Sequence, residues 1–249
     1  MSAGNRPRHR AFVPPSDPDT KIWRYMDFTG FVDMLSHAGL FFCRVDRFDD
    51  PFEGSIPRRW LEESKIEDDS LGNTGISRPA IVAISREELL KQRPWVLVNC
   101  WHMNEGESVA MWKLYAGSSR AICIQSTYGK LDEALDSGLF IGKVNYISYE
   151  DDDIPIGNLF WPIMHKRKSF EHERELRAVS CDVPSATTGN NAPPEYGEWR
   201  SVDLDALIDV VYVAPSAPRW FAELVENVSK KYDLQKPVKH SSLDAEPLR

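Results

Sequence analysis

The amino-acid sequence predicts a single α+β domain in which mixed or antiparallel sheets are flanked by short helices. Apolar runs typical of strands outnumber the helical patterns and do not alternate with them regularly, which argues against a doubly wound parallel sheet. The length of 249 residues fits one domain. The sequence contains no standard Gly-rich phosphate loop and no G-x-S-x-G motif, so Rossmann, P-loop and α/β-hydrolase folds are excluded.

The N-terminal residues 1–20 are expected to form a flexible leader, and residues 21–249 the domain. The leader contains Arg6, Arg8 and Arg10, followed by several prolines, and it has no apolar stretch of the kind found in signal peptides. No segment of the chain reaches the apolar length that a membrane span requires. We therefore expect a cytoplasmic protein without a membrane partner.

In the first part of the domain, a strand is predicted at residues 22–26. A helix follows, because apolar residues recur at helical spacing from Phe28 to Leu35, and Gly39 occupies the position where a left-handed residue often ends a helix. An aromatic-rich strand is expected at 40–45, and Pro51 and Gly54 indicate a turn at 49–54.

The middle of the chain is expected to alternate between exposed and buried segments. Residues 62–77 are polar and acidic and suggest an exposed insertion with some helix. Strands are predicted at 95–101 and 121–125, with a short helix between them that Ser108 caps and Gly117 ends. Further on, the patterns predict a strand at 143–149, a helix over much of 159–174, an extended segment at 176–183 and a loop at 186–197.

The C-terminal part is expected to form a strand-helix-strand unit. Residues 207–213 are β-rich, Pro218 suits the first turn of a helix, and 237–241 can return as a strand. The apolar residues of that helix are expected on one face; they are Trp220, Phe221, Leu224, Val225 and Val228. Such a unit would be a parallel crossover.

Charge and composition narrow the classes of partner. The net charge of −8 argues against broad binding to the phosphate backbone of nucleic acids. The four cysteines lie in apolar surroundings without the short spacing of a zinc or redox motif, which is typical of free thiols in a reducing compartment. No pair of histidines has the spacing of a catalytic zinc site.

The strongest candidate site is the segment from Phe170 to Arg177, F-E-H-E-R-E-L-R. If this segment is extended, Glu173, Glu175 and Arg177 share one face, where the arginine and the second carboxylate would tune the pKa of the first. If it is helical, the same residues form a solvated face of ion pairs. The spacing leaves both interpretations open.

Two other positions carry polar groups that suit a site. Asp49, Asp50 and Glu53 cluster in the turn at 49–54, where carboxylates can bind a hard metal ion or cap the backbone. Arg24 alternates with Trp23 and Tyr25, so its guanidinium would point away from both rings, a placement that suits an arginine holding a phosphate or a carboxylate.

Several motifs together resemble a bacterial family catalogued as domain of unknown function 2971. They are W-R-Y-M, D-D-P-F-E-G, N-C-W-H followed by M-W-K-L-Y-A, K-S-F-E-H-E-R-E-L-R and V-Y-V-A-P-S-A-P-R-W-F. The resemblance extends from about Ile22 to about Leu243. The family pattern of an aromatic residue and then E-x-E-x-R corresponds here to Phe170, Glu173, Glu175 and Arg177.

The order of these motifs is also similar to that of ADP-ribosyltransferases, and this resemblance implies an enzyme that consumes NAD. Arg24 would then anchor the cofactor, Glu175 would stabilise the positively charged ribose, and Glu173 would orient the acceptor. The remaining cofactor-binding residues implied by the resemblance are Tyr25, His102, Trp112, Tyr115 and Arg177. No metal is expected, the acceptor can be a protein, a nucleic acid or a small molecule, and the resemblance suggests a role in bacterial defence or toxin-antitoxin systems.

Two other functions are compatible with the same residues. A metal-dependent nuclease or hydrolase would use Asp50, Glu53 and Glu173 as ligands. A non-catalytic binding or regulatory module would use the charged residues around Glu175 as a lattice of ion pairs. The three functions differ in where these side chains meet, which only the tertiary structure decides.

Overall fold

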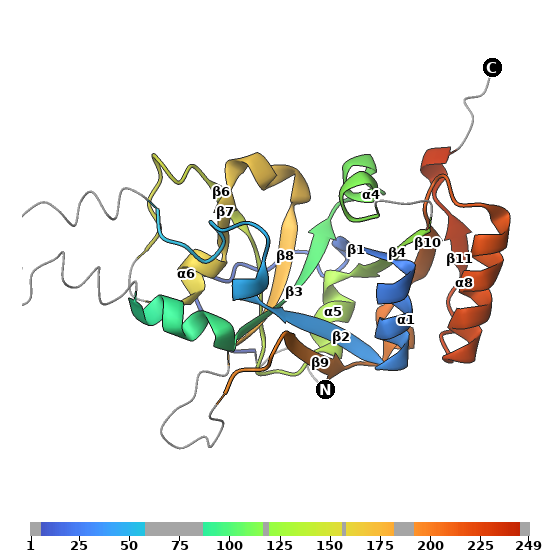
Figure 1. Cartoon of the computed structure of the whole chain (residues 1–249), viewed down its shortest axis with the longest axis horizontal. Helices are drawn as coiled ribbons and strands as arrows, with labels where there is room; N and C mark the ends of the chain where they lie inside the picture. Colours follow the sequence, from blue (N-terminus) through green and yellow to red (C-terminus); the bar gives the residue numbers. More distant parts are fainter. Residues whose placement is uncertain (1–5, 58–86, 117–119, 156–157, 182–191, 245–249) are drawn as a thin grey trace, which may run out of the picture.

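The structure is a computed structural model that describes residues 6–57, 87–116, 120–155, 158–181 and 192–244. It confirms the α+β class, because short helices surround one large sheet in which antiparallel and parallel pairs are mixed (Figure 1). No helix within these ranges is long and apolar enough to cross a membrane. The acidic segment at 62–77 lies outside the described residues.

The large sheet has nine strands among the described residues. In chain order they are β1 (Lys21–Asp27), β2 (Gly39–Arg44), β3 (Val96–Met103), β4 (Ala121–Thr127), β5 (Phe140–Lys143), β8 (Glu175–Cys181), β9 (Gly197–Ser201), β10 (Val210–Val213) and β11 (Val238–His240). The order in space is β11-β10-β4-β1-β3-β2-β9, and β8 lies between β3 and β5. Within this large sheet, each described pair of neighbouring strands is antiparallel except β10 and β11, which are parallel.

The central strand β3 has neighbours of unequal length on its two edges. One edge pairs with β8 from Val96 to His102. The other edge is shared, since β2 pairs with Leu97 and Val98 whereas β1 pairs with His102 and Met103. The sheet is therefore split between β1 and β2, opposite residues 99–101 of β3.

Helix α1 (Phe28–Ser36) follows β1 directly, and Asp27 caps it by accepting a hydrogen bond from the backbone of Gly30 at 2.7 Å. The left-handed residue after this helix is Ala38, with φ of 44°, and not Gly39 as expected. Gly39 begins β2 instead, where a Cβ atom would lie 2.5 Å from the carbonyl oxygen of Arg200. The glycine thus permits close approach of β2 to β9.

The long helix expected at 159–174 is wrong. The chain forms α6 (Phe160–Ile163), then β7 (His165–Arg167), then the 3-10 helix η3 (Lys168–Glu173). β7 is extended because it pairs with β6 (Asn145–Ile147), a strand distant in sequence. Arg174 then adopts a left-handed conformation, with φ of 42°, and turns the chain into β8.

The strand expected at 143–149 is divided between two sheets. Its first residue ends β5, which pairs with β8, and the next part forms β6, which pairs with β7. Val144 separates them, and its backbone donates a hydrogen bond to the carbonyl of Glu175 at 2.9 Å. Two other strands match their predictions closely, since β3 and β4 cover the segments expected at 95–101 and 121–125.

The C-terminal strand-helix-strand unit is confirmed, with β10 and β11 parallel and α8 (Arg219–Lys231) between them. The segment expected as a strand from residue 207 begins later, because α7 (Leu204–Leu207) precedes β10. On α8, Phe221 and Val225 are buried, whereas Trp220 is 51% exposed and does not belong to the buried face. The pattern of a single apolar face therefore holds only in part.

Strand β9 was not predicted, since the sequence suggested a loop up to residue 197. Its five residues read G-E-W-R-S and lack an apolar run, but they pair with β2 along its length.

Two helices flank β4 in the chain. Helix α4 (Val109–Ala116) comes before it and is preceded by Ser108 as expected, and α5 (Tyr128–Ala134) follows it. Both pack beside β4.

The expected flexible leader is packed against the domain at residues 6–20. Ala11 is buried and Phe12 is only 8% exposed, and the ring of Phe12 stacks on Phe140 at 4.8 Å between centroids. Phe12 belongs to a second core cluster, beside the main core under β1, β3 and β4.

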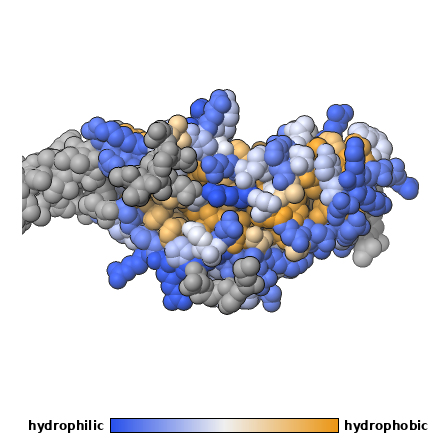
Figure 2. All heavy atoms as spheres, turned by 90° about the horizontal axis from the view of Figure 1, so that it is seen from below, coloured by the Kyte–Doolittle hydropathy of each residue, from blue (hydrophilic) through white to orange (hydrophobic). Residues whose placement is uncertain are grey.

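Figure 2 shows apolar residues gathered along the middle of one face, between hydrophilic margins.

Candidate functional site

The split between β1 and β2 is bridged by side chains instead of strand pairing. Arg24 Nη1 donates to the carbonyl of Cys100 at 3.1 Å, which is one of the groups that the split leaves without a ladder partner. Asn99 Nδ2 donates to the carbonyl of Phe41 at 2.9 Å, and Trp101 Nε1 donates to Asn99 Oδ1 at 2.7 Å. These bonds attach β1 and β2 to β3 on the two sides of the split.

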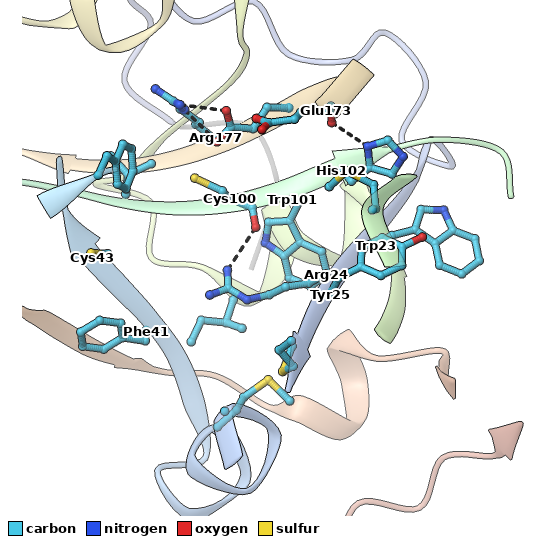
Figure 3. A pocket seen from close by; sticks show the side chains of 18 of the residues that line it. Trp23, Arg24, Tyr25, Phe41, Cys43, Cys100, Trp101, His102, Glu173 and Arg177 are labelled. Atoms are coloured by element: carbon cyan, nitrogen blue, oxygen red, sulfur yellow. Dashed lines mark hydrogen bonds and ion pairs between the residues drawn. The ribbon is translucent and has the colours of Figure 1, made fainter. Parts of the chain in front are cut away.

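A cavity of about 470 Å³ occupies this split (Figure 3). Its polar lining includes most of the residues that the sequence had singled out, and they come from three neighbouring strands and the end of η3; they are Arg24, His102, Glu173, Glu175 and Arg177. The volume lies within the range of small-molecule sites. The structure thus brings the candidate residues to one place, although they are far apart in sequence.

Arg24 is a partly buried cation that lines this cavity. Among the described residues, its side chain makes one hydrogen bond, to the carbonyl of Cys100, and no carboxylate lies within ion-pair distance. Burial lowers the pKa of its guanidinium, but arginine stays charged in proteins. A guanidinium has five N–H donors, so most of its hydrogen-bonding capacity remains for a ligand.

Glu173 and Arg177 lie above Arg24 and Cys100 in Figure 3. They belong to a cluster of five charged groups, whose other members are Glu53, Lys166 and Glu175. Lys166 Nζ contacts Glu53 at 2.8 Å and Glu173 at 2.5 Å, and it lies 3.7 Å from Glu175. Arg177 binds Glu175 through Nε at 3.0 Å and Nη2 at 2.8 Å, and the same Nη2 contacts Glu53 at 2.5 Å. Three carboxyl groups therefore share two cations.

The cluster is charged and buried. Burial alone would raise the pKa of Glu175, but the charge and hydrogen bonds of Arg177 outweigh it and hold this pKa below its ordinary value. Burial would likewise lower the pKa of Lys166 and of Arg177, yet the carboxylates of Glu175 and Glu53 raise both. The formal charge of the five groups is −1, so this end of the cavity has an excess of negative charge.

His102 connects the cavity wall to η3. Its Nδ1 lies 2.6 Å from the carbonyl oxygen of Glu173, and because a carbonyl only accepts, Nδ1 carries the proton. Burial lowers the pKa of this imidazole, which favours the neutral ring. Nε2 is buried and has no hydrogen-bond partner among the described residues.

The remaining aromatic candidates differ in their relation to the cavity. Tyr25 lines it, and its hydroxyl accepts a hydrogen bond from the backbone of Ser108 at 2.9 Å. Trp112 does not line the cavity and packs behind it, with its ring 5.1 Å from that of Tyr25. Tyr115 belongs to α4, but its side chain lies outside the described residues.

The ligand set of a metal-dependent hydrolase is not assembled. Asp50 forms an ion pair with Arg167 at 2.9 Å, whereas the carboxylates of Glu53 and Glu173 converge on Lys166. In the described part of the chain, no group of three or more acidic, histidine or cysteine residues is placed to hold a metal ion. A cationic ammonium occupies the point where the carboxylates meet, so these residues do not fit a metal.

Sequence reasoning missed two kinds of residue. Lys166 was not among the candidates, because its segment was expected to be helical. The thiols of Cys43 and Cys100 also line the cavity, and burial raises the pKa of both. The pairing of β8 with β3 places Cys100 beside Arg177, and the pairing of β7 with β6 positions Lys166.

Glu171 and His172 also belong to the segment 170–177, but both are exposed and neither lines the cavity. No protein-family model matches the chain, and no curated protein matches it in sequence. The candidate site is therefore defined by its geometry: a cavity in a split sheet, with a partly buried arginine that has no carboxylate partner in the described part of the chain, and a cluster rich in carboxylates.

Proposed function

We propose that the protein binds NAD in this cavity and transfers its ADP-ribose group, as an ADP-ribosyltransferase-like enzyme of the cytoplasm. The observation that carries the proposal is the placement of Arg24 and Glu175 in one cavity, on strands β1 and β8 that flank β3 on opposite edges. The motif order alone predicted that these two residues meet, although 150 positions separate them in the sequence.

The charges of the cavity complement those of NAD. The cofactor has a cationic nicotinamide ring at one end and anionic phosphates in the middle. Arg24, whose guanidinium has no carboxylate partner among the described residues, suits the phosphates. The carboxylate-rich cluster around Glu175 suits the nicotinamide riboside end, where positive charge is located.

The transfer begins with cleavage of the bond between the nicotinamide nitrogen and C1′ of the ribose. The electron pair leaves with nicotinamide, which becomes neutral, and positive charge develops on the sugar. Glu175 stabilises this charge, since its pKa is held low and its carboxylate stays ionised. The nucleophile of the acceptor then bonds to C1′, and its proton passes to Glu173.

Lys166 and Arg177 serve as positioning residues in this scheme. Arg177 fixes both oxygens of Glu175, and Lys166 fixes Glu173 at 2.5 Å. Preorganised charges of this kind need no rearrangement during the reaction. The acceptor is a protein, a nucleic acid or a small molecule, and the net charge of −8 argues against long duplexes.

The test is incubation of the purified protein with NAD, with nicotinamide release as the readout. Glu175→Gln should reduce the rate by roughly 100- to 1000-fold, the usual loss when one group that stabilises developing charge is removed. Glu171→Gln is the matched control, because Glu171 is exposed and outside the cavity, and its rate should equal that of the wild type. Thermal unfolding of both variants checks that they fold.

The proposal is overturned if the wild-type protein neither releases nicotinamide nor binds NAD in calorimetry at millimolar concentration. A second candidate is a non-catalytic nucleotide-binding module. It is favoured because both carboxylate oxygens of Glu175 already accept hydrogen bonds from Arg177. Binding of NAD without release of nicotinamide, in the presence of candidate acceptors, would support this second function instead.

A further inference from the structure

The cavity also has an aromatic part that the proposed chemistry does not use. Phe41 on β2 and Trp199 on β9 are directly paired across the sheet, and both line the cavity. Their ring centroids lie 5.2 Å apart with planes inclined at 54°. Both side chains are only partly buried, so each presents apolar ring surface to the space that Arg24 also faces.

The other aromatic rings around the cavity are already covered. Trp23, Tyr25 and Trp101 are at most 7% exposed and belong to the core clusters. Phe48 lies under the guanidinium of Arg177, which sits 5.3 Å from its ring centroid. Among the described residues, Phe41 and Trp199 are therefore the partly buried aromatic side chains of the cavity wall that lie away from the charged cluster.

The position of Trp199 is fixed by the structure. One face of its indole stacks on the ring of His37 with an interplanar angle of 2° and a centroid distance of 4.3 Å. A ring held in this way loses little conformational freedom when a ligand binds. Close to it, Leu40 and Met34 add apolar side chains to the cavity wall.

In Figure 3, Phe41 lies on the far side of Arg24 and Cys100 from Glu173 and Arg177. The cavity therefore has an aromatic end and a carboxylate-rich end, with the cation Arg24 between them, for which the described residues supply no ion-pair partner. A nucleoside phosphate has the matching sequence of groups, a flat ring followed by an anion. Base rings stack favourably on aromatic side chains, largely independent of base identity.

We propose that Phe41 and Trp199 form the subsite for a nucleobase, and that Arg24 binds the adjoining phosphate. The identification of the whole ligand as NAD rests on the proposed function. The base subsite itself needs no cleavage chemistry, so a simple mononucleotide such as AMP can probe it directly.

The test compares binding of AMP and of ribose 5-phosphate by calorimetry. Trp199→Ala should weaken AMP binding roughly 5- to 150-fold, which is the stacking contribution of one base expressed as an affinity ratio. It should leave ribose 5-phosphate unchanged, because that probe has no base. Trp199→Phe retains a ring and should restore most of the AMP affinity, whereas Arg24→Gln should weaken both probes.

Trp220→Ala is the matched control, since Trp220 is 51% exposed on α8 and does not line the cavity. Its affinities should equal those of the wild type. The subsite is overturned if Trp199→Ala binds AMP as tightly as the wild type, if it loses both probes equally, or if the wild type binds no AMP at millimolar concentration. Intact AMP binding without nicotinamide release from NAD would instead remove the transferase function and leave the subsite in place.

Discussion

Replacement of Arg177 by methionine tests whether the buried cluster stabilises the fold through its charges. The Arg177 side chain has no exposed surface, and it donates hydrogen bonds to Glu175, Glu53 and the carbonyl of Ile163. Methionine retains most of the volume but none of the donors. Glu53 and Glu175, which lose their bonds to Arg177, would then share the single cation Lys166 with Glu173 in a buried site.

Removal of one partner from a buried ion pair costs about 3–5 kcal/mol, since the remaining charge stays buried without compensation. For a chain of this size, each kcal/mol lowers the melting temperature by about 2–4 °C. We therefore expect Arg177→Met to reduce the melting temperature at neutral pH by roughly 6–20 °C. The loss would exceed that of any single surface substitution.

The pH dependence has a defined sign. In the wild type, the folded-state pKa of Glu175 is lowered, so its contribution to stability is present above the unfolded pKa and lost as pH falls through the folded pKa. In Arg177→Met, the burial of Glu175 is no longer outweighed, its pKa rises, and ionisation opposes folding. The difference in stability between the two proteins should therefore narrow as pH falls from about 7 to about 4.5.

Chemical unfolding in urea at several pH values measures this difference. Arg219→Met provides the matched control, because Arg219 forms an ion pair with Glu223 at 3.2 Å on the exposed surface of α8. Its stability should change little at any pH. A cost below about 1 kcal/mol for Arg177→Met at neutral pH, or a cost that does not vary with pH, would refute the assignment of a charged, buried cluster.

Two further predictions concern the parts of the fold that the sequence did not reveal. Phe12→Ala should destabilise the protein by about 3–5 kcal/mol in urea unfolding, since the ring is buried against Phe140; a change below 1 kcal/mol would mean that residues 6–20 do not contribute to the core. Gly39→Ala should cost about 1–3 kcal/mol, because the new Cβ would lie 2.5 Å from a carbonyl oxygen of β9; a thermal melt equal to that of the wild type would contradict the close approach of β2 and β9.

The strands and helices that were predicted well have strong local patterns. The segments around Trp101, Ile122 and Val211 are continuous apolar runs, and buried strands require such runs whatever their partners. The alternation that placed Glu175 and Arg177 on one face is also a local property, because successive side chains of a strand point to opposite faces. These predictions needed no knowledge of the neighbouring strands.

The segments that were predicted wrongly depend on distant partners. Residues 165–167 have a composition compatible with a helix, but pairing with β6 makes them extended and turns Lys166 towards Glu173. Strand β9 lacks an apolar run, and its pairing with β2 supplies its backbone hydrogen bonds. Local propensity is a weak preference that tertiary contacts override in both cases.

The sequence by itself therefore determined the α+β class, the main strands and the face shared by Glu175 and Arg177. Only the tertiary structure decided that this face is buried, that Glu53 joins it across 124 positions of the chain, and that Lys166 lies among the three carboxylates. The physical reason is that ion pairs and strand register are set by distances between segments remote in sequence. Those distances follow from the packing of the whole sheet, including the split between β1 and β2 that creates the cavity.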